Sequence, residues 1–200
     1  PIPMEQNENF IKRWKPVARK FIGMNEGNHP WKLHRMGNLT RYACDRLKIE
    51  YGTFRTVVVF RDRKGEILFR SFHTHGRKLI RSVAEPVMRG LTNMRLTLQR
   101  QLSALISNAI LCCKGHTHLL FHSAPTLVLY MRKKNGKIVQ GYTNPDQLEV
   151  VTPLDDQVQQ SKVPKDYIHP DDRWYVNTGS FLRTIGEDMV TYQEAFEYPP

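Results

Sequence analysis

The stretch Ala109-Ile110-Leu111-Cys112-Cys113-Lys114-Gly115-His116-Thr117-His118 decides how this chain is interpreted, because an apolar segment runs into a loop with two histidines. Residues 109–113 are predicted to form a strand, which leads into this loop. Side chains alternate along an extended segment, so His116 and His118 point to the same side. Gly115 permits a tight turn and a close approach of the backbone to a ligand. Imidazole is the commonest metal ligand in proteins, so the loop predicts half of a metal site.

Two loops upstream also carry histidines at the ends of predicted strands. They are Gly27-Asn28-His29 and Thr74-His75-Gly76. Sheets of α/β proteins place their functional sites at strand ends, so we expect these loops to meet the loop after residue 113. His73 is a rival to His75, because both face the same way on an extended segment.

Apolar spacing and turn residues predict an α/β chain in which helices cover the sheets. Helical spacing is found in residues 6–22, where Pro16 should kink or end the helix, and in residues 38–48 and 87–109. An Asn-Gly pair predicts the second of two hairpins. The predicted strands and loop are 56–60 with 66–70, 109–113, 126–131 with 137–140, a polar loop over 152–172, a strand over 174–181 and a last strand over 189–196.

Length and composition fit one domain over residues 1–200. Hydrophobic residues make up 40% of the chain and charged residues 24%, which is typical of a globular protein. No apolar run is long enough to span a bilayer, and no signal-peptide pattern is present, so we expect no membrane partner. The three cysteines, Cys44, Cys112 and Cys113, form no disulfide framework, and we therefore expect a cytoplasmic protein.

The formal net charge of +11 favours a polyanionic partner, and nucleic acid is the first candidate. Lysine and arginine recur in clusters, notably in residues 12–20, 61–64, 77–81 and 132–137. The simpler interpretation is a solvated basic surface, with the basic hairpin tip as an ordinary turn.

The ordered set Gly27-Asn28-His29, Thr74-His75-Gly76, Gly115–His118 and Tyr175–Ser180 resembles the calcineurin-like metallophosphoesterases over about residues 21–196. The resemblance implies a two-sheet β-sandwich flanked by helices, here N-terminally incomplete. It also implies hydrolysis of a phosphate ester, as a phosphodiesterase or nuclease, by a hydroxide bound to divalent metal. The match to Thr-His-Gly favours His75 over His73.

The resemblance further implies a role for each candidate residue. Asn28, His75 and His116 would ligate one metal ion, His118 would ligate another, and His29 would act as general acid or bind the phosphate. Two divalent ions are implied, Mn or else Zn, Fe, Ni or Mg, and together they clamp the phosphate and activate a water. Residues 132–172 would form a hairpin and loop insertion on the substrate side.

The sequence departs from the family in two respects. The Asp-x-His and Gly-Asp-x-x-Asp loops, which supply carboxylate ligands, occur nowhere in the 200 residues, and Pro30 stands where the family usually has an acid that orients the histidine before it. We therefore expect the missing loops upstream of residue 1, the chain to be an internal fragment, and the fragment to be inactive.

Other interpretations stay open. The chain could be a catalytically inactive module that binds nucleic acid or a protein, or His75, His116 and His118 could hold a structural zinc. Asn177 and Ser180 could contact substrate, although a turn that closes a strand explains them better. His34 and His122, which belong to no motif, are expected to be structural or at the surface, and His169 in the polar loop is expected to be solvent exposed.

Overall fold

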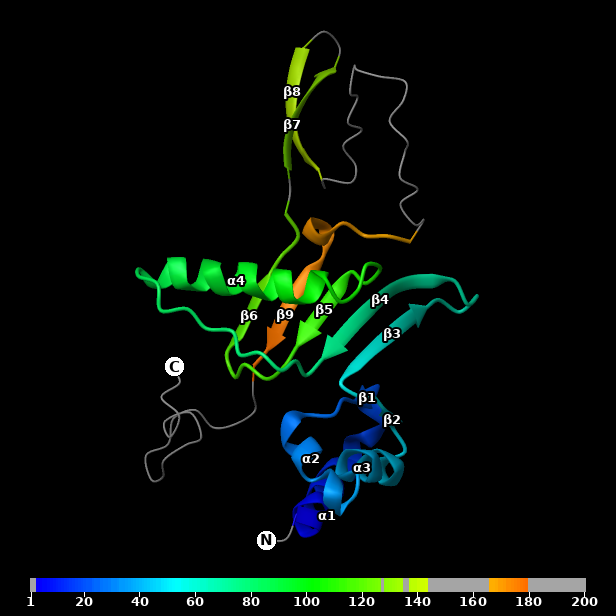
Figure 1. Cartoon of the computed structure of the whole chain (residues 1–200). Helices are drawn as coiled ribbons and strands as arrows, with labels where there is room; N and C mark the ends of the chain where they lie inside the picture. Colours follow the sequence, from blue (N-terminus) through cyan, green and yellow to red (C-terminus); the bar gives the residue numbers. More distant parts are fainter. Residues whose placement is uncertain (1–2, 127, 135–136, 144–165, 180–200) are drawn as a thin grey trace, which may run out of the picture.

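The computed structural model describes residues 3–126, 128–134, 137–143 and 166–179 (Figure 1). Its α-helices are α1 (Pro3–Trp14), α2 (Asn28–Lys32), α3 (Leu39–Leu47) and α4 (Val87–Ser103), and its 3-10 helices are η1 (Lys15–Lys20), η2 (His34–Met36) and η4 (Pro170–Asp172). Its strands are β1 (Gly23–Met24), β2 (Glu50–Tyr51), β3 (Arg55–Arg61), β4 (Ile67–Thr74), β5 (Leu111–Lys114), β6 (Leu120–Ser123), β7 (Val128–Lys134), β8 (Lys137–Thr143) and β9 (Trp174–Thr178).

The centre of the fold is a five-stranded mixed sheet with the order β3-β4-β5-β9-β6. Strands β4, β5 and β9 run parallel to one another, while β3 and β6 are antiparallel to their neighbours at the two edges. Two small sheets accompany it, β1 parallel to β2 and the hairpin β7–β8. The predicted α/β class is confirmed, whereas the two-sheet sandwich stays a prediction.

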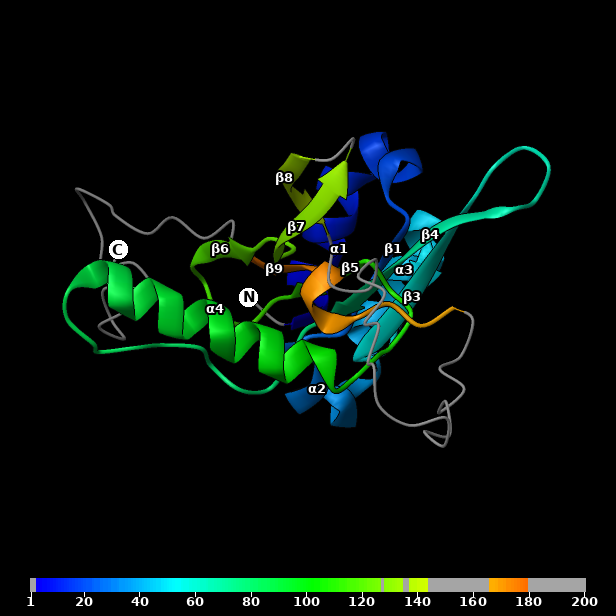
Figure 2. The same ribbon diagram turned by 90° about the horizontal axis from the view of Figure 1, so that it is seen from above.

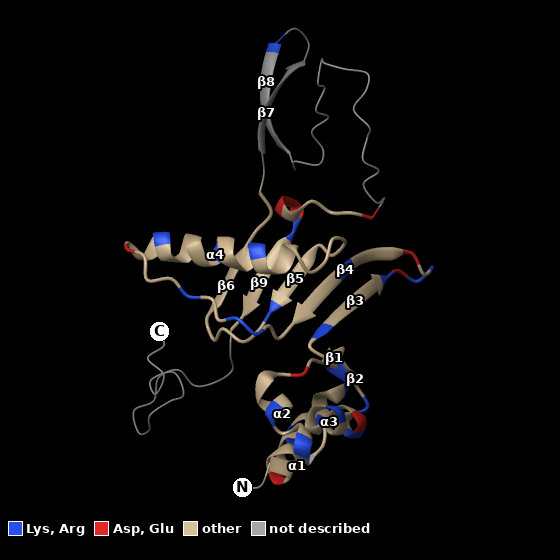
Figure 3. Ribbon diagram, in the orientation of Figure 1, with Lys and Arg blue, Asp and Glu red and all other residues tan. Residues whose placement is uncertain are grey.

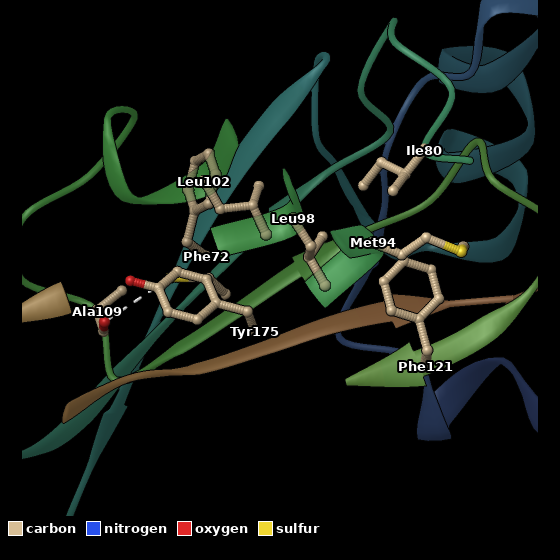
Figure 4. Close-up of a cluster of buried hydrophobic side chains, with 9 residues drawn as sticks. Phe72, Ile80, Met94, Leu98, Leu102, Ala109, Phe121 and Tyr175 are labelled. Carbon is tan, nitrogen blue, oxygen red and sulfur yellow. Dashed lines mark hydrogen bonds between the residues drawn. The ribbon is translucent and has the colours of Figure 1, made fainter. Parts of the chain in front are cut away.

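Helix α4 covers one face of this sheet (Figures 1 and 2). Alternation along the strands aims Phe72, Cys112 and Tyr175 at the helix, and all three are buried. They pack with buried α4 residues in a single cluster (Figure 4), whose helical members are Met94, Leu98 and Leu102. The spacing of apolar residues in α4, one helical turn apart, creates the stripe that this face of the sheet needs.

The predicted helix over 87–109 is too long, since α4 ends at Ser103. The chain turns there, with the Leu105 backbone N–H donating to the Leu102 carbonyl, and it must cross the sheet edge to enter β5. Ala109 is buried in the core, but it lies in the segment between α4 and β5 and not in the helix. Among the described residues, no helix has the length and apolar character needed to cross a membrane.

A second cluster holds the N-terminal helices together below the sheet (Figure 1). Its buried members are Ile11, Ala18, Ala43 and Leu47. Helix α1 ends at Trp14, and the chain continues as η1 with Pro16 in its first turn. Proline is tolerated there because backbone N–H groups in a first turn have no partner within the helix. This confirms the predicted effect of Pro16, and α3 confirms the predicted helix over 38–48.

The remaining predictions are mostly confirmed where the structure describes them. The hairpins β3–β4 and β7–β8 and the strands β5 and β9 occupy the expected segments, and the three cysteines are buried and free. The hairpin β7–β8 extends away from the sheet (Figure 1). Ser180, the predicted strand over 189–196 and most of the predicted 152–172 loop lie outside the described residues.

Arg173 joins the segment before β9 to the segment before β5. Its side chain is 1% exposed, and its guanidinium donates to the carbonyls of Ile106, Ser107 and Ile168. A buried cation is stable only where such acceptors satisfy it, so this one side chain determines how both segments approach the sheet.

Replacing Arg173 with Met should lower the free energy of unfolding by about 3 kcal/mol, because the partly buried carbonyls of Ile106 and Ile168 lose the guanidinium as their donor. Urea unfolding followed by circular dichroism measures this loss. The matched control is Arg100→Met at an exposed position on α4, with an expected change of less than about 0.5 kcal/mol. Equal losses in the two variants would contradict the anchoring role of Arg173.

Candidate functional site

The site is organised by a row of three residues at the ends of the parallel strands. Thr74 of β4 pairs in register with Lys114 of β5, and Lys114 pairs with Asn177 of β9. All three are buried, with exposed fractions of 8%, 2% and 0%. Because the strands are parallel, the loops that follow β4 and β5 leave the sheet at one edge, next to this row.

Each residue of the row holds a loop through its side chain. Thr74 donates its hydroxyl to the Phe54 carbonyl and accepts from the Gly76 backbone N–H. Lys114 Nζ donates to the Lys78 carbonyl at 2.7 Å. Asn177 Nδ2 donates to the Thr117 carbonyl at 2.7 Å and to that of Leu119. Buried polar groups satisfied in this way fix the loops with respect to the sheet.

The loop with Asn28 is attached to the same sheet from below. Asn25 Nδ2 donates to the His73 carbonyl at 3.1 Å, and Thr56 Oγ1 donates to Asn25 Oδ1 at 2.7 Å. Gly52 is required here, since a Cβ at this position would lie 2.1 Å from Thr56 Oγ1. The segment before the Gly27-Asn28-His29 loop is thereby attached to β3 and β4.

Glu26, directly before this loop, is the centre of a second network. Its side chain is 2% exposed and accepts hydrogen bonds from the Tyr51 hydroxyl at 2.7 Å and from His34 Nε2. Its backbone N–H donates to the Thr53 carbonyl at 3.1 Å. His34, expected to be structural or at the surface, is therefore a structural residue that helps position the loop.

Asn28 at the start of α2 comes together with His75 and His116 from the loops after β4 and β5. Asn28 Oδ1 lies 2.9 Å from His75 Nε2, and His75 Nε2 lies 3.2 Å from His116 Nδ1. The two imidazole rings are nearly perpendicular, at 73°, with centroids 5.1 Å apart. His116 adopts a left-handed φ of 70°, an uncommon conformation for a residue with a side chain and one that occurs at functional sites.

The spacing of these three atoms suits adjacent ligands of one metal ion. Ligands about 2.1 Å from a metal and at right angles to each other lie about 3 Å apart, close to the observed separations. These three donors would be half of a six-coordinate shell. Only two of them are imidazoles, and among the described residues no group of three or more His, Cys, Asp or Glu side chains could hold a metal. The amide of Asn28 is the third donor in this case.

His29 and His118 complete the predicted set of site residues. His29 is exposed and His118 partly buried, and the charge of either imidazole acts on both His75 and His116 and lowers their pKa values. His75 also lines a cavity of about 630 Å³ whose wall includes Tyr51, His73 and Cys113. Space for further ligands or for a phosphate group therefore adjoins His75.

Burial and positive neighbours lower the pKa values of His75 and His116. Desolvation, followed by the charges of His116 and Lys114, lowers the pKa of His75 to about 4. Desolvation and Lys114 also lower the pKa of His116. A neutral imidazole is the form that ligates metal, so neither residue must lose a proton near pH 7 before it binds an ion.

Lys114 is the largest electrostatic feature next to the histidines. Desolvation lowers its pKa to about 8, so the ammonium form dominates at pH 7. Among the described residues, Lys114 forms no ion pair within 4.0 Å of a carboxylate. The site is therefore electropositive and favours an anion. A metal cation would need additional carboxylate ligands to offset this positive field.

The other histidines have structural surroundings. His73 Nε2 lies 2.9 Å from Ser71 Oγ, whereas His75 lies beside Asn28 and His116, which favours His75 as the site residue. His122 is exposed, near Trp174. The prediction that His169 is solvent exposed is wrong, since this residue is partly buried and caps η4 by accepting from the Asp171 N–H. The complete burial of Asn177 supports the structural interpretation of this residue.

Sequence reasoning missed Lys114, Glu26 and Asn25. The signals were present, because Lys114 directly precedes Gly115 and Glu26 directly precedes Gly27. A lysine at the end of an apolar strand is ordinarily a solvated charge, and only the pairing of β4 with β5 reveals that this one is buried.

A scan against protein-family models found no match for this chain, and searches of curated proteins and of solved structures found none either.

Gly76 is required where the loop after β4 crosses Lys114. Its φ is +75°, and a Cβ would lie 2.6 Å from Lys114 Cε. Gly76→Ala should lower the free energy of unfolding by about 2–4 kcal/mol, from the left-handed backbone and from overpacking against a held side chain. Urea unfolding measures the change.

Gly65→Ala is the matched control for this prediction. Gly65 has a φ of +90° but no atom within 4 Å of a Cβ, so this variant has only the backbone cost of about 1 kcal/mol. The prediction is wrong if the two variants lose the same stability.

Proposed function

We propose that this chain contributes to a metal-dependent phosphoesterase that hydrolyses a phosphate ester. The observation that carries the proposal is the position of His75, whose Nε2 lies 2.9 Å from Asn28 Oδ1 and 3.2 Å from His116 Nδ1, although these residues are 47 and 41 positions away in sequence. The resemblance of the same loops to the calcineurin-like metallophosphoesterases is independent support, since it was drawn from the order of the motifs alone.

In this proposal the chain holds metal through an amide oxygen and imidazoles. Asn28, His75 and His116 would bind one divalent ion, and His118 would bind a second. When bound, the ions would offset the charge on the phosphate and activate a water for attack on phosphorus. The Mn, Zn, Fe and Ni ions suit imidazole ligands, whereas Mg would need more oxygen ligands than these residues supply.

His29 would work on the other side of the phosphorus atom. Its imidazole is exposed at the start of α2, next to the cluster, where a substrate can reach it. As the bond from phosphorus to the leaving oxygen breaks, His29 would donate a proton to that oxygen. Lys114, buried in the strand-end row, would keep the field positive where a phosphate binds.

The proposal also requires a two-sheet sandwich. It requires carboxylate ligands as well, and the motifs in this sequence do not supply them. Val57 and Val59 of β3 are 44% and 39% exposed and line the cavity next to His75. Apolar residues at this position would suit a second sheet packed on that face. The hairpin and loop of residues 132–172 would then be an insertion on the substrate side.

The first test is metal binding by the chain itself. Calorimetric titration with Mn²⁺ should give one weak site, and His75→Ala should weaken binding at least about tenfold because a direct ligand is lost. His122→Ala removes an exposed imidazole outside the cluster and is the control. Equal binding by wild type and His75→Ala would contradict the proposed ligand set.

The second test is hydrolysis of bis(p-nitrophenyl) phosphate by the protein expressed from its complete reading frame. Mn²⁺ should stimulate the reaction, and His116→Ala should lower kcat/KM about 100-fold or more. His29→Gln should lower kcat by about 10²–10⁴-fold while Mn²⁺ affinity is kept, because His29 would transfer a proton and bind no metal. Full activity in His116→Ala would overturn the proposal.

A further inference from the structure

A second groove lies on the α4 side of the sheet, apart from the cavity next to His75. Its volume is about 810 Å³, and it runs between the second half of α4, the loop after β4 and the start of β3. We call it the basic groove, because five of the residues that line it are basic: Arg55, Arg77, Lys78, Arg100 and Lys114.

The charge of the basic groove is uncompensated. Its lining includes no aspartate or glutamate, and within the described part of the chain none of its five basic residues forms an ion pair within 4.0 Å. Arg55, Arg77, Lys78 and Arg100 are exposed, so their charges can meet a ligand. Figure 3 shows basic residues at the start of β3, the end of β5 and the loop below α4. Such a concave surface of one sign attracts polyanions.

The basic groove adjoins the candidate site through residues next to the histidines. Thr74 and Gly76, which flank His75 in sequence, both line it, and so does Lys114, two residues before His116. The Lys114 ammonium group donates to the Lys78 carbonyl, so the rim of the groove and the loop of the site are held by one side chain. A polyanion in the groove would therefore lie beside the loops that carry His75 and His116.

One aromatic residue, Phe54, lines the basic groove. Phe54 is partly buried, the Arg77 guanidinium lies 5.4 Å from its ring centroid, and Trp31 packs edge-on against it at 5.1 Å. Aromatic rings beside a line of positive charge are the combination by which proteins bind single-stranded nucleic acid, because bases stack while phosphates pair with the cations. A groove of this volume fits a few nucleotides of one strand.

We propose that the basic groove binds single-stranded nucleic acid and leads its phosphodiester backbone to the histidine cluster. This inference gives the proposed phosphoesterase its substrate class. Cleavage of the nucleic acid rests on the proposed phosphoesterase function, whereas binding in the groove does not. Phosphate contacts of this kind give affinity without sequence preference and depend strongly on salt.

Fluorescence anisotropy of a labelled oligothymidylate of about 20 nucleotides tests the inference, in EDTA so that binding is measured without metal. The variant Arg77→Gln/Lys78→Gln/Arg100→Gln should bind at least about tenfold more weakly than wild type. Its slope of log K against log salt should be smaller by about 2, since each lost contact to a single strand removes about 0.7.

The matched control is Arg13→Gln/Arg63→Gln/Lys64→Gln, which removes the same charge from exposed positions on α1 and the β3–β4 turn. It should change affinity less than about threefold. Equal weakening in both triple variants would show attraction by net charge alone and overturn the inference. Absence of binding by wild type, or tighter binding of duplex or of anionic vesicles than of the single strand, would also overturn it.

The two proposals fail separately. Oligonucleotide binding by the groove without hydrolysis of bis(p-nitrophenyl) phosphate would reject the phosphoesterase and leave the groove intact. Mn²⁺-stimulated hydrolysis of this small ester, unchanged in the groove variant and accompanied by no oligonucleotide binding, would reject the groove and keep the phosphoesterase.

Discussion

The register of three parallel strands is the constraint on which the site depends. Thr74, Lys114 and Asn177 lie side by side because β4, β5 and β9 pair without offset. Each is buried, and each uses its polar group on a loop beyond the strand ends. A shift of one residue in any strand would aim these groups at the opposite face and leave the loops without anchors. The core under α4 therefore also determines the geometry of the histidines.

A buried ammonium group in this row gives the site its electrostatic character. Lys114 lowers the pKa values of His75 and His116 and adds to the charge of the basic groove on its other side. Buried charges are costly, and this one is satisfied by the Lys78 and Gly115 carbonyls without a carboxylate among the described residues. One residue thus links a neutral, ligand-ready cluster to a surface that attracts phosphates.

The loop with Asn28 reaches the cluster through a different set of contacts. Glu26 is held by Tyr51 and His34, and Asn25 is held by β3 and β4. Pro30 stands where the resemblance would place an orienting acid, and the acidic residue in this region is instead Glu26, which lies before the loop and binds His34. The position of Asn28 therefore depends on contacts between residues far apart in the chain.

The sequence by itself determined the elements and the candidate residues. Apolar periodicity located α3, α4 and both hairpins, and the glycine-histidine loops marked Asn28, His75 and His116, because local spacing and turn chemistry act within a few residues. The match to Thr-His-Gly favours His75 over His73 in the sequence itself. Only the tertiary structure decided that Lys114 is buried, that His75 meets both Asn28 and His116, and that α4 ends at Ser103. These outcomes depend on which strands pair and where the chain must turn to pair them, and pairing partners more than 35 residues apart leave no local pattern.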